Sequence, residues 1–118
     1  MAERPVPIWI ENFLDMMVSN RGAPPNTLDA YRRDMLDFAA FIARRHREPE
    51  RASADHVRAY MRAISDKGLA PSTAARRLST LRRFFRFVIE ESGVRDDDPT
   101  STQDGPKIGA RLPKFLSE

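Results

Sequence analysis

The sequence predicts an all-α fold, a compact four-helix bundle followed by an extended C-terminal linker. Three observations support this class. Apolar residues recur at three- and four-residue steps in four segments, which is the period of an amphipathic helix. Proline and glycine fall between these segments, and no segment has the alternating pattern of a convincing strand. A chain of 118 residues also fits one domain with one modest core.

The first helix is expected from about residue 7 to residue 19. Gly22 follows it and suits a left-handed C-terminal cap. Pro24 and Pro25 then form a stiff connector. The positions that would face the core are Ile10, Phe13, Leu14, Met17 and Val18.

The second helix is expected to begin at Asn26 or Thr27, because either side chain can accept a hydrogen bond from the first turn. It should reach about Arg45, with basic residues at its end that suit the helix macrodipole. Its apolar stripe comprises Leu28, Tyr31, Met35, Phe38, Ala39 and Ile42.

The third and fourth helices are defined by their end signals. Ser53 is a candidate N-cap for the third helix, and Lys67 with Gly68 ends it. The fourth helix is expected from about residue 72 to residue 91, with a proline near its first position and with Ser92 and Gly93 closing it. The apolar positions are Val57, Tyr60, Met61 and Ile64 in the third helix, and Ala74, Leu78, Leu81, Phe85 and Val88, widened by Phe84 and Ile89, in the fourth.

The composition changes after Gly93. An acidic turn is followed by residues 100–114, which contain proline and glycine and have no helical period, a pattern typical of a linker. We therefore divide the chain into a helical domain, residues 1–99, and a linker with the start of another element, residues 100–118. Because the sequence stops on a candidate helix cap, we expect it to be a fragment cut at a domain boundary.

The composition argues against several kinds of site and location. The chain has no cysteine, which removes disulfides and thiolate metal sites and is compatible with a reducing cytosol. No apolar run is long enough to span a membrane, and the first residues are unlike a signal peptide. We therefore expect a cytoplasmic protein. His46 and His56 have no second ligand at metal-binding spacing, so we expect surface residues and neither a metal nor a cofactor.

Arginine supplies nearly all of the positive charge. Lys and Arg number 20 against 17 acidic residues, a net charge of +3, and guanidinium binds phosphate bidentately. Residues 72–87 (STAARRLSTLRRFFRF) contain five arginines and no acid. On a helical wheel one face of this segment is apolar. The other face holds Ser72, Thr73, Arg76, Arg77, Ser79, Thr80, Arg82, Arg83 and Arg86.

This basic face predicts a polyanionic partner. Clustered like charges repel one another, so the arrangement costs stability unless an anion is bound. Hydroxyl groups can donate to phosphates, and long arginines can reach guanine edges in the major groove of duplex DNA. With three residues from the first half of the second helix, where backbone N–H groups can also meet phosphate, the candidate DNA-binding residues are Thr27, Arg32, Arg33, Ser72, Thr73, Arg76, Arg77, Ser79, Thr80 and Arg83.

Other interpretations stay open at this point. The basic face could be an ordinary solvated surface, or it could bind an acidic protein. The chain could also be a non-enzymatic helical module that recruits a protein through the first helix, with Trp9, Phe13, Met16 and Met17 as its anchoring surface. A stand-alone enzyme is not supported, because no set of acid, base and nucleophile can be assembled. We therefore assign no catalytic residue.

Four stretches of the chain resemble the tyrosine recombinases. Residues 27–38 (TLDAYRRDMLDF) are similar to the TL-x-x-Y-x-x-D-L-x-x-F helix of that family, and residues 72–87 are similar to its second signature helix. Residues 97–100 (DDPT) resemble the turn that closes its N-terminal domain. Residues 106–117, with PK and RLPKFLS, resemble the linker into its catalytic domain. The likeness covers nearly the whole chain and is strongest to the Xer branch, which resolves bacterial chromosome dimers.

The resemblance implies a SAM-like, four-helix core-binding domain that forms one half of a clamp around duplex DNA at a recombination site. Its second and fourth helices would lie against the major groove. Its first helix would contact neighbouring protomers in a synaptic tetramer, with a XerC-like recombinase as a possible partner, while the isolated domain would be a monomer. The catalytic residues would belong to a downstream domain. Phage and mobile-element integrases have the same domain, so that role is an alternative.

Overall fold

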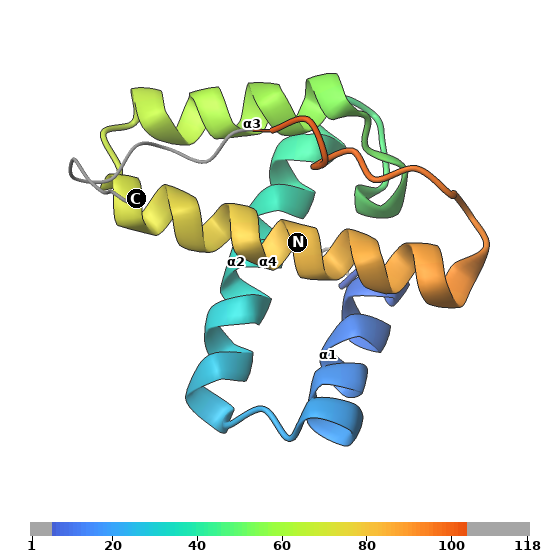
Figure 1. Cartoon of the computed structure of the whole chain (residues 1–118). Coiled ribbons are helices and arrows are strands. Elements are labelled where there is room, and N and C mark those ends of the chain that lie inside the picture. Colours follow the sequence, from blue (N-terminus) through green and yellow to red (C-terminus); the bar gives the residue numbers. More distant parts are fainter. Residues whose placement is uncertain (1–5, 104–118) are drawn as a thin grey trace, which may run out of the picture.

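The computed structural model describes residues 6–103, and within that range it is all-helical, with no strand (Figure 1). The predicted four-helix class is therefore confirmed. One short 3-10 helix was not predicted. The elements are α1 (Ile8–Arg21), α2 (Pro25–Ala43), the 3-10 helix η1 (Pro49–Arg51), α3 (Ala54–Asp66) and α4 (Pro71–Ser92).

The four helices are arranged as two crossed pairs. α1 and α2 form an antiparallel hairpin, and α4 crosses both of them (Figure 1). α3 lies along α4 and also contacts α2. No helix among the described residues is long and apolar enough to cross a bilayer.

Aromatic side chains connect all four helices in the core. Phe13 of α1 meets Phe84 of α4 edge to face, with ring centroids 5.7 Å apart. Phe38 of α2 lies 5.1 Å from the ring of Tyr60 of α3 and 6.2 Å from that of Phe85 of α4. The four phenylalanines are fully buried. Edge-to-face pairs add to the free energy of burial, so this cluster fixes how the two pairs of helices cross.

The predicted helix ends are mostly confirmed. Gly22 and Gly93 adopt left-handed conformations, with φ of 60° and 69°, as C-terminal caps of α1 and α4. The predicted caps of α2 are wrong. This helix begins at Pro25, with Pro24 as the cap position, and no side chain caps it. Proline suits the first position because its missing N–H would have no helical partner there.

The segment after α4 folds back over the bundle. Arg95 donates from Nη1 to the carbonyl oxygens of Glu50 (3.2 Å) and Ala52 (2.6 Å) in and just after η1. Gln103 donates from Nε2 to the carbonyl of Ala54 (3.2 Å), and its own carbonyl accepts from Nη2 of Arg82 (2.7 Å). Packing thus continues to residue 103. The division into domains at residue 99 stays a prediction, and residues 104–118 lie outside the described range.

Ser53 and His56 form a reciprocal capping box at the start of α3. The Ser53 hydroxyl accepts from the His56 backbone N–H (3.2 Å), and Nδ1 of the His56 ring accepts from the Ser53 backbone N–H (3.0 Å). The predicted Ser53 cap is confirmed. The role of His56 was not predicted, because glutamate or glutamine usually occupies this position. Burial lowers the pKa of His56, and the positive charges of Arg47 and Arg45 lower it further, against a raising effect of Asp55.

Replacing Phe38 with alanine should lower the free energy of unfolding by about 3–5 kcal/mol, because it leaves a cavity among buried rings. Urea denaturation would measure the loss. Ile8→Ala is the matched control, since Ile8 is 65% exposed, and it should change stability by less than about 0.5 kcal/mol. Equal effects of the two substitutions would contradict the assignment of the core.

The stability of the chain should fall as the pH is lowered below 6.5, the ordinary pKa of histidine. The unfolded chain then binds a proton at His56, whereas the folded chain with its lowered pKa does not. This loss should continue until the pH reaches the lowered folded pKa. It should be absent in His56→Gln, which keeps the capping box without titrating.

The measurement is urea denaturation over a pH series. His46→Asn is the control, because His46 has a φ of 60°, which asparagine tolerates, and lies outside the box. If the pH dependence disappears in His46→Asn but persists in His56→Gln, the proposed origin at the α3 cap is wrong.

Candidate nucleic-acid interface

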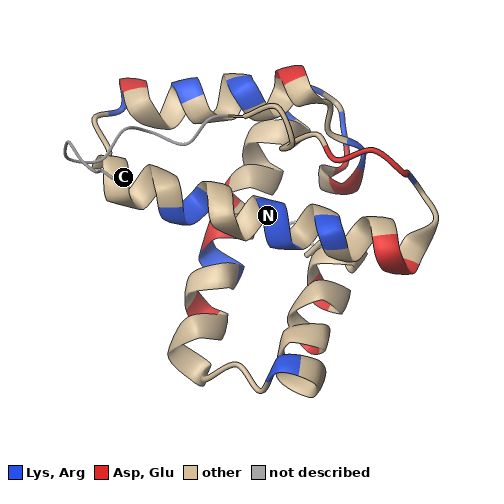
Figure 2. Cartoon of the chain, in the orientation of Figure 1, with Lys and Arg blue, Asp and Glu red and all other residues tan. Residues whose placement is uncertain are grey.

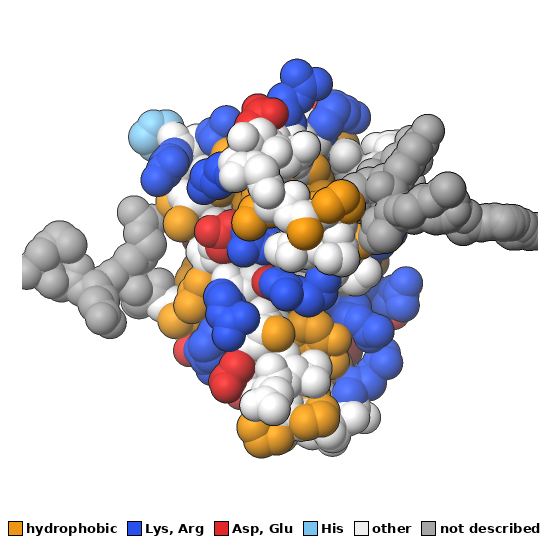
Figure 3. Space-filling view, turned by 90° about the vertical axis from the view of Figure 1, so that its left-hand side faces the viewer, with side chains coloured by type: hydrophobic (Ala, Val, Ile, Leu, Met, Phe, Trp, Pro, Cys, Tyr) orange, Lys and Arg blue, Asp and Glu red, His pale blue; other side chains and the backbone are white. Residues whose placement is uncertain are grey.

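The exposed face of α4 carries positive charge over most of its length. Arginines recur along this helix, and the acidic residues of α4 lie only at its C-terminal end (Figure 2). On the face seen in space-filling view, basic side chains outnumber acidic ones (Figure 3). The exposed residues of α4 that carry a positive charge or a hydroxyl are Ser72, Arg76, Ser79, Arg82, Arg83 and Arg86.

The carboxylate of Asp34, on α2, contacts the basic residues of α4 from the buried side of that helix. Asp34 is only 1% exposed, and its two oxygens bind two residues of α4. Arg76 donates to it from Nη2 (2.7 Å) and Nε (3.3 Å), and the Thr80 hydroxyl donates to it at 2.9 Å. Hydrogen bonds of this charged type are about twice as strong as neutral ones. Asp34 therefore links α2 to α4.

A second carboxylate, that of Asp37, links three helices. It accepts from Nη1 of Arg77 (2.7 Å) and from the hydroxyl of Tyr60 (2.8 Å). The side chain of Arg77 is 15% exposed, and its Nε lies 3.8 Å from Asp34 without a hydrogen bond. Burial raises the pKa of Tyr60, and the Asp37 carboxylate raises it further, so the phenol stays protonated and donates.

The expectation that the clustered arginines need a bound anion to offset their repulsion is therefore wrong for Arg76 and Arg77. Both arginines form ion pairs with carboxylates of α2. Thr80 is 1% exposed, so it belongs to the buried side of α4. A signal for this was present in the sequence. Asp34 lies within the apolar stripe of α2, and a charge in such a position requires a buried partner.

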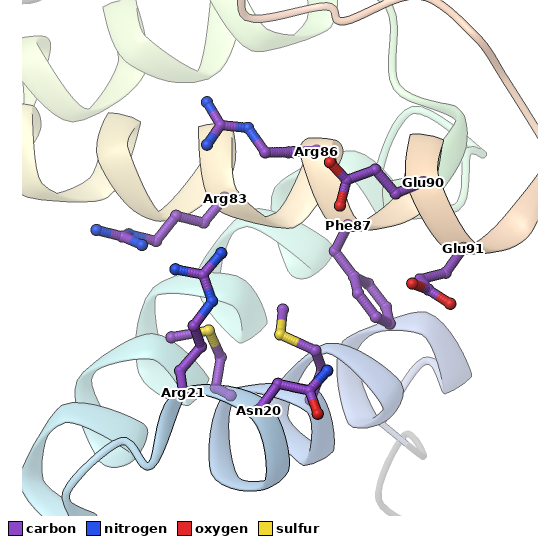
Figure 4. A pocket seen from close by; sticks show the side chains of 9 residues that line it. Asn20, Arg21, Arg83, Arg86, Phe87, Glu90 and Glu91 are labelled. Carbon is purple, nitrogen blue, oxygen red and sulfur yellow. The ribbon is translucent and has the colours of Figure 1, made fainter.

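Arg83 and Arg86 keep their positive charge on the surface. Both are exposed, and no carboxylate within residues 6–103 lies at ion-pair distance from either. They line a hollow of about 120 Å³ between α1 and α4. Arg21 of α1 and Arg83 of α4 extend on the same side of it, while Glu90 and Glu91 lie at its other end (Figure 4).

The remaining candidates lie on the first halves of α2 and α4. Arg33 is exposed. Arg32 lies 3.9 Å from Glu11 of α1, and since both are more than 40% exposed this contact contributes little stability. Thr27 and Thr73 are half-buried. The structure thus separates the predicted arginines into exposed cations and cations paired to α2. Among the predicted hydroxyl residues, Ser72 and Ser79 are exposed, whereas Thr80 is buried.

A comparison with protein-family models identifies this architecture. Residues 10–92 match the family described as phage integrase, N-terminal SAM-like domain. The matched range begins in α1 and ends with the last residue of α4, so it covers all four helices.

Several curated relatives carry the same name. The chain is 46% identical over 108 residues to the tyrosine recombinase XerD of Brucella suis, 45% over 109 residues to that of Rhizobium meliloti, and 44% over 108 residues to that of Caulobacter vibrioides. Each match covers 92% of this chain and 35% of the relative. The chain thus spans about a third of the length of these relatives. No solved structure matched the chain.

Replacing Arg77 with leucine should lower the free energy of unfolding by about 2–3 kcal/mol, because it leaves the Asp37 carboxylate without its cationic partner. Urea denaturation would measure it. Arg83→Leu is the matched control and should change stability by less than about 0.5 kcal/mol, since Arg83 is exposed and forms no ion pair with the described residues. If Arg77→Leu is as stable as this control, the ionic link between the helices carries no stability.

Proposed function

The chain belongs to the phage integrase N-terminal SAM-like family, with XerD tyrosine recombinases among its relatives, and we propose that it binds duplex DNA as the core-binding domain of a site-specific recombinase. The observation that carries the proposal is the line of exposed arginines on α4. From Arg76 to Arg86 this helix rises by ~15 Å. Such a length of duplex carries roughly nine phosphate charges.

The exposed arginines of α2 and α4 support one binding surface. Arg33 on α2 and Arg83 and Arg86 on α4 are free to meet phosphates, since no described carboxylate pairs with them. The major groove is about 12 Å wide and admits a helix. We place the exposed face of α4 toward this groove, with the first half of α2 beside it.

The biological role that we propose follows from the relatives. The parent protein would be a Xer-type recombinase that resolves chromosome dimers in the cytoplasm at the nucleoid. It would act in a synaptic tetramer with a XerC-like partner. The residues that break and rejoin DNA would lie in a downstream catalytic domain, since this chain spans 35% of the XerD relatives. A phage or mobile-element integrase is the alternative within the same family.

A different class of function is favoured by one observation on α1. Ile8 is 65% exposed, and Val18 is 51% exposed, so the prediction that Val18 faces the core is wrong; both side chains are suited to contact with another protein. A module that only recruits a protein through α1 would not bind DNA. DNA binding by the purified chain therefore discriminates the two candidates.

The chain should bind a fluorescein-labelled duplex with an affinity that falls steeply as salt is raised, because phosphate contacts release counterions. Fluorescence anisotropy over a salt series would measure this. The double reversal Arg83→Glu with Arg86→Glu should weaken binding and reduce the slope of log K against log salt by about two, one for each lost phosphate contact. Arg77 is left unchanged, since its replacement would disturb the fold.

The control is the double reversal Arg51→Glu with Arg62→Glu, which changes the net charge equally but lies outside α2 and α4. It should retain most of the affinity. Equal losses in both double variants would mean that only net charge matters. An unchanged affinity in the α4 variant would refute the proposed surface.

A further inference from the structure

We propose that Arg76 reads a base of the bound DNA and that Asp34 and Thr80 are positioning residues that aim it. The inference rests on the proposed DNA binding and adds a division of roles among the arginines of α4. Arg76, which forms an ion pair with Asp34, would recognise a base. Arg83 and Arg86, which form no ion pair with the described residues, would bind phosphates.

The pairing leaves the outer edge of the Arg76 guanidinium available. A guanidinium has five N–H groups. Asp34 occupies the side edge through Nε and Nη2, which leaves three N–H groups on Nη1 and Nη2 without a hydrogen bond to any residue from 6 to 103. The side chain of Arg76 is 45% exposed. Its free edge can donate two parallel hydrogen bonds, which is the arrangement that O6 and N7 of guanine accept.

The carboxylate that holds Arg76 is itself fixed. Asp34 lies on the buried side of α2, at 1% exposure, and accepts a further hydrogen bond from Thr80, which is equally buried. An arginine held in this way loses less side-chain freedom when it binds. The guanidinium of Arg76 is therefore held in one orientation before DNA binds. A fixed orientation favours a base whose two acceptors match it over bases whose acceptors do not.

The charges favour a base over a phosphate for this residue. The positive charge of Arg76 is offset by the Asp34 carboxylate 2.7 Å away, and that carboxylate repels a nearby phosphate. A guanine edge is neutral and offers two acceptors. Arg83, with no carboxylate at ion-pair distance among the described residues, keeps its full attraction for phosphate. The two arginines should therefore respond differently to substitution by lysine.

The 118-residue chain is used to select the sequences that it prefers from a pool of randomised DNA duplexes. The base preference at each position is then compared between the unaltered chain and its variants. Arg76→Lys keeps the charge and can still pair with Asp34, but it cannot donate two parallel bonds. It should lose roughly tenfold or more of the preference at one G·C base pair while the salt dependence stays unchanged. Arg83→Lys is the matched control and should keep the preference at every position.

The positioning role is tested by two further variants. Thr80→Val removes the hydroxyl at equal size and should reduce the preference at the same base pair, whereas Thr80→Ser should restore it. Asp34→Asn should also reduce that preference. Because Arg76 then regains an unpaired charge, this variant should steepen the salt slope by about one, an effect that a purely structural defect would not produce. Circular dichroism confirms folding of each variant.

Each result has a definite meaning. If the unaltered chain binds no duplex, the proposed function fails, and this inference fails with it. If the chain binds DNA but Arg76→Lys keeps the preference at every position, or if no sequence is enriched, Arg76 does not read a base although DNA binding stands. If Thr80→Val and Asp34→Asn both keep the preference, Arg76 acts without positioning residues.

Discussion

The buried carboxylate of Asp34 is the constraint on which the arrangement of α2 and α4 depends. A charge at 1% exposure is tolerated only with a partner, and that partner is supplied by α4 through Arg76 and Thr80. The aromatic contacts fix how the helices cross, and the ionic contacts add directional bonds between particular positions of α2 and α4. The ionic contacts fix the register, so the same residues that join the helices also determine which arginines remain exposed.

This constraint explains why the basic face has two kinds of arginine. Arg77 is 15% exposed and is shared with Asp37 and Tyr60, so its charge serves the contact among three helices. Arg83 and Arg86, about 1.7 and 2.5 helical turns further along, form no ion pair with a carboxylate of α2 and stay exposed. The carboxylates of α2 thus offset the repulsion among the arginines in the first part of α4. In the second part no such carboxylate is present among the described residues, and the repulsion between Arg83 and Arg86 remains.

Local sequence patterns predicted most of the helices of the fold. They did not predict the contacts between residues that are far apart in the sequence. Apolar periodicity and the end signals at Gly22, Ser53 and Gly93 correctly identified four helices, because these signals act within one or two turns. The ion pairs join residues 40 and 42 positions apart, so the local pattern around Asp34 indicates that it needs a buried partner but does not identify that partner. Arg95, which is far from the 3-10 helix in sequence, donates to a carbonyl oxygen within it, and this contact too has no local pattern. Whether the ten candidate DNA-binding residues touch DNA stays a prediction.

The hydrogen bonds of Arg82 and Gln103 have a mechanical consequence. They tie residue 103 to the middle of α4 and, through the Ala54 carbonyl, to the first residue of α3. A force that pulls on residue 103 should therefore break these two hydrogen bonds first. The contacts of the aromatic core should resist the force only after these bonds are broken.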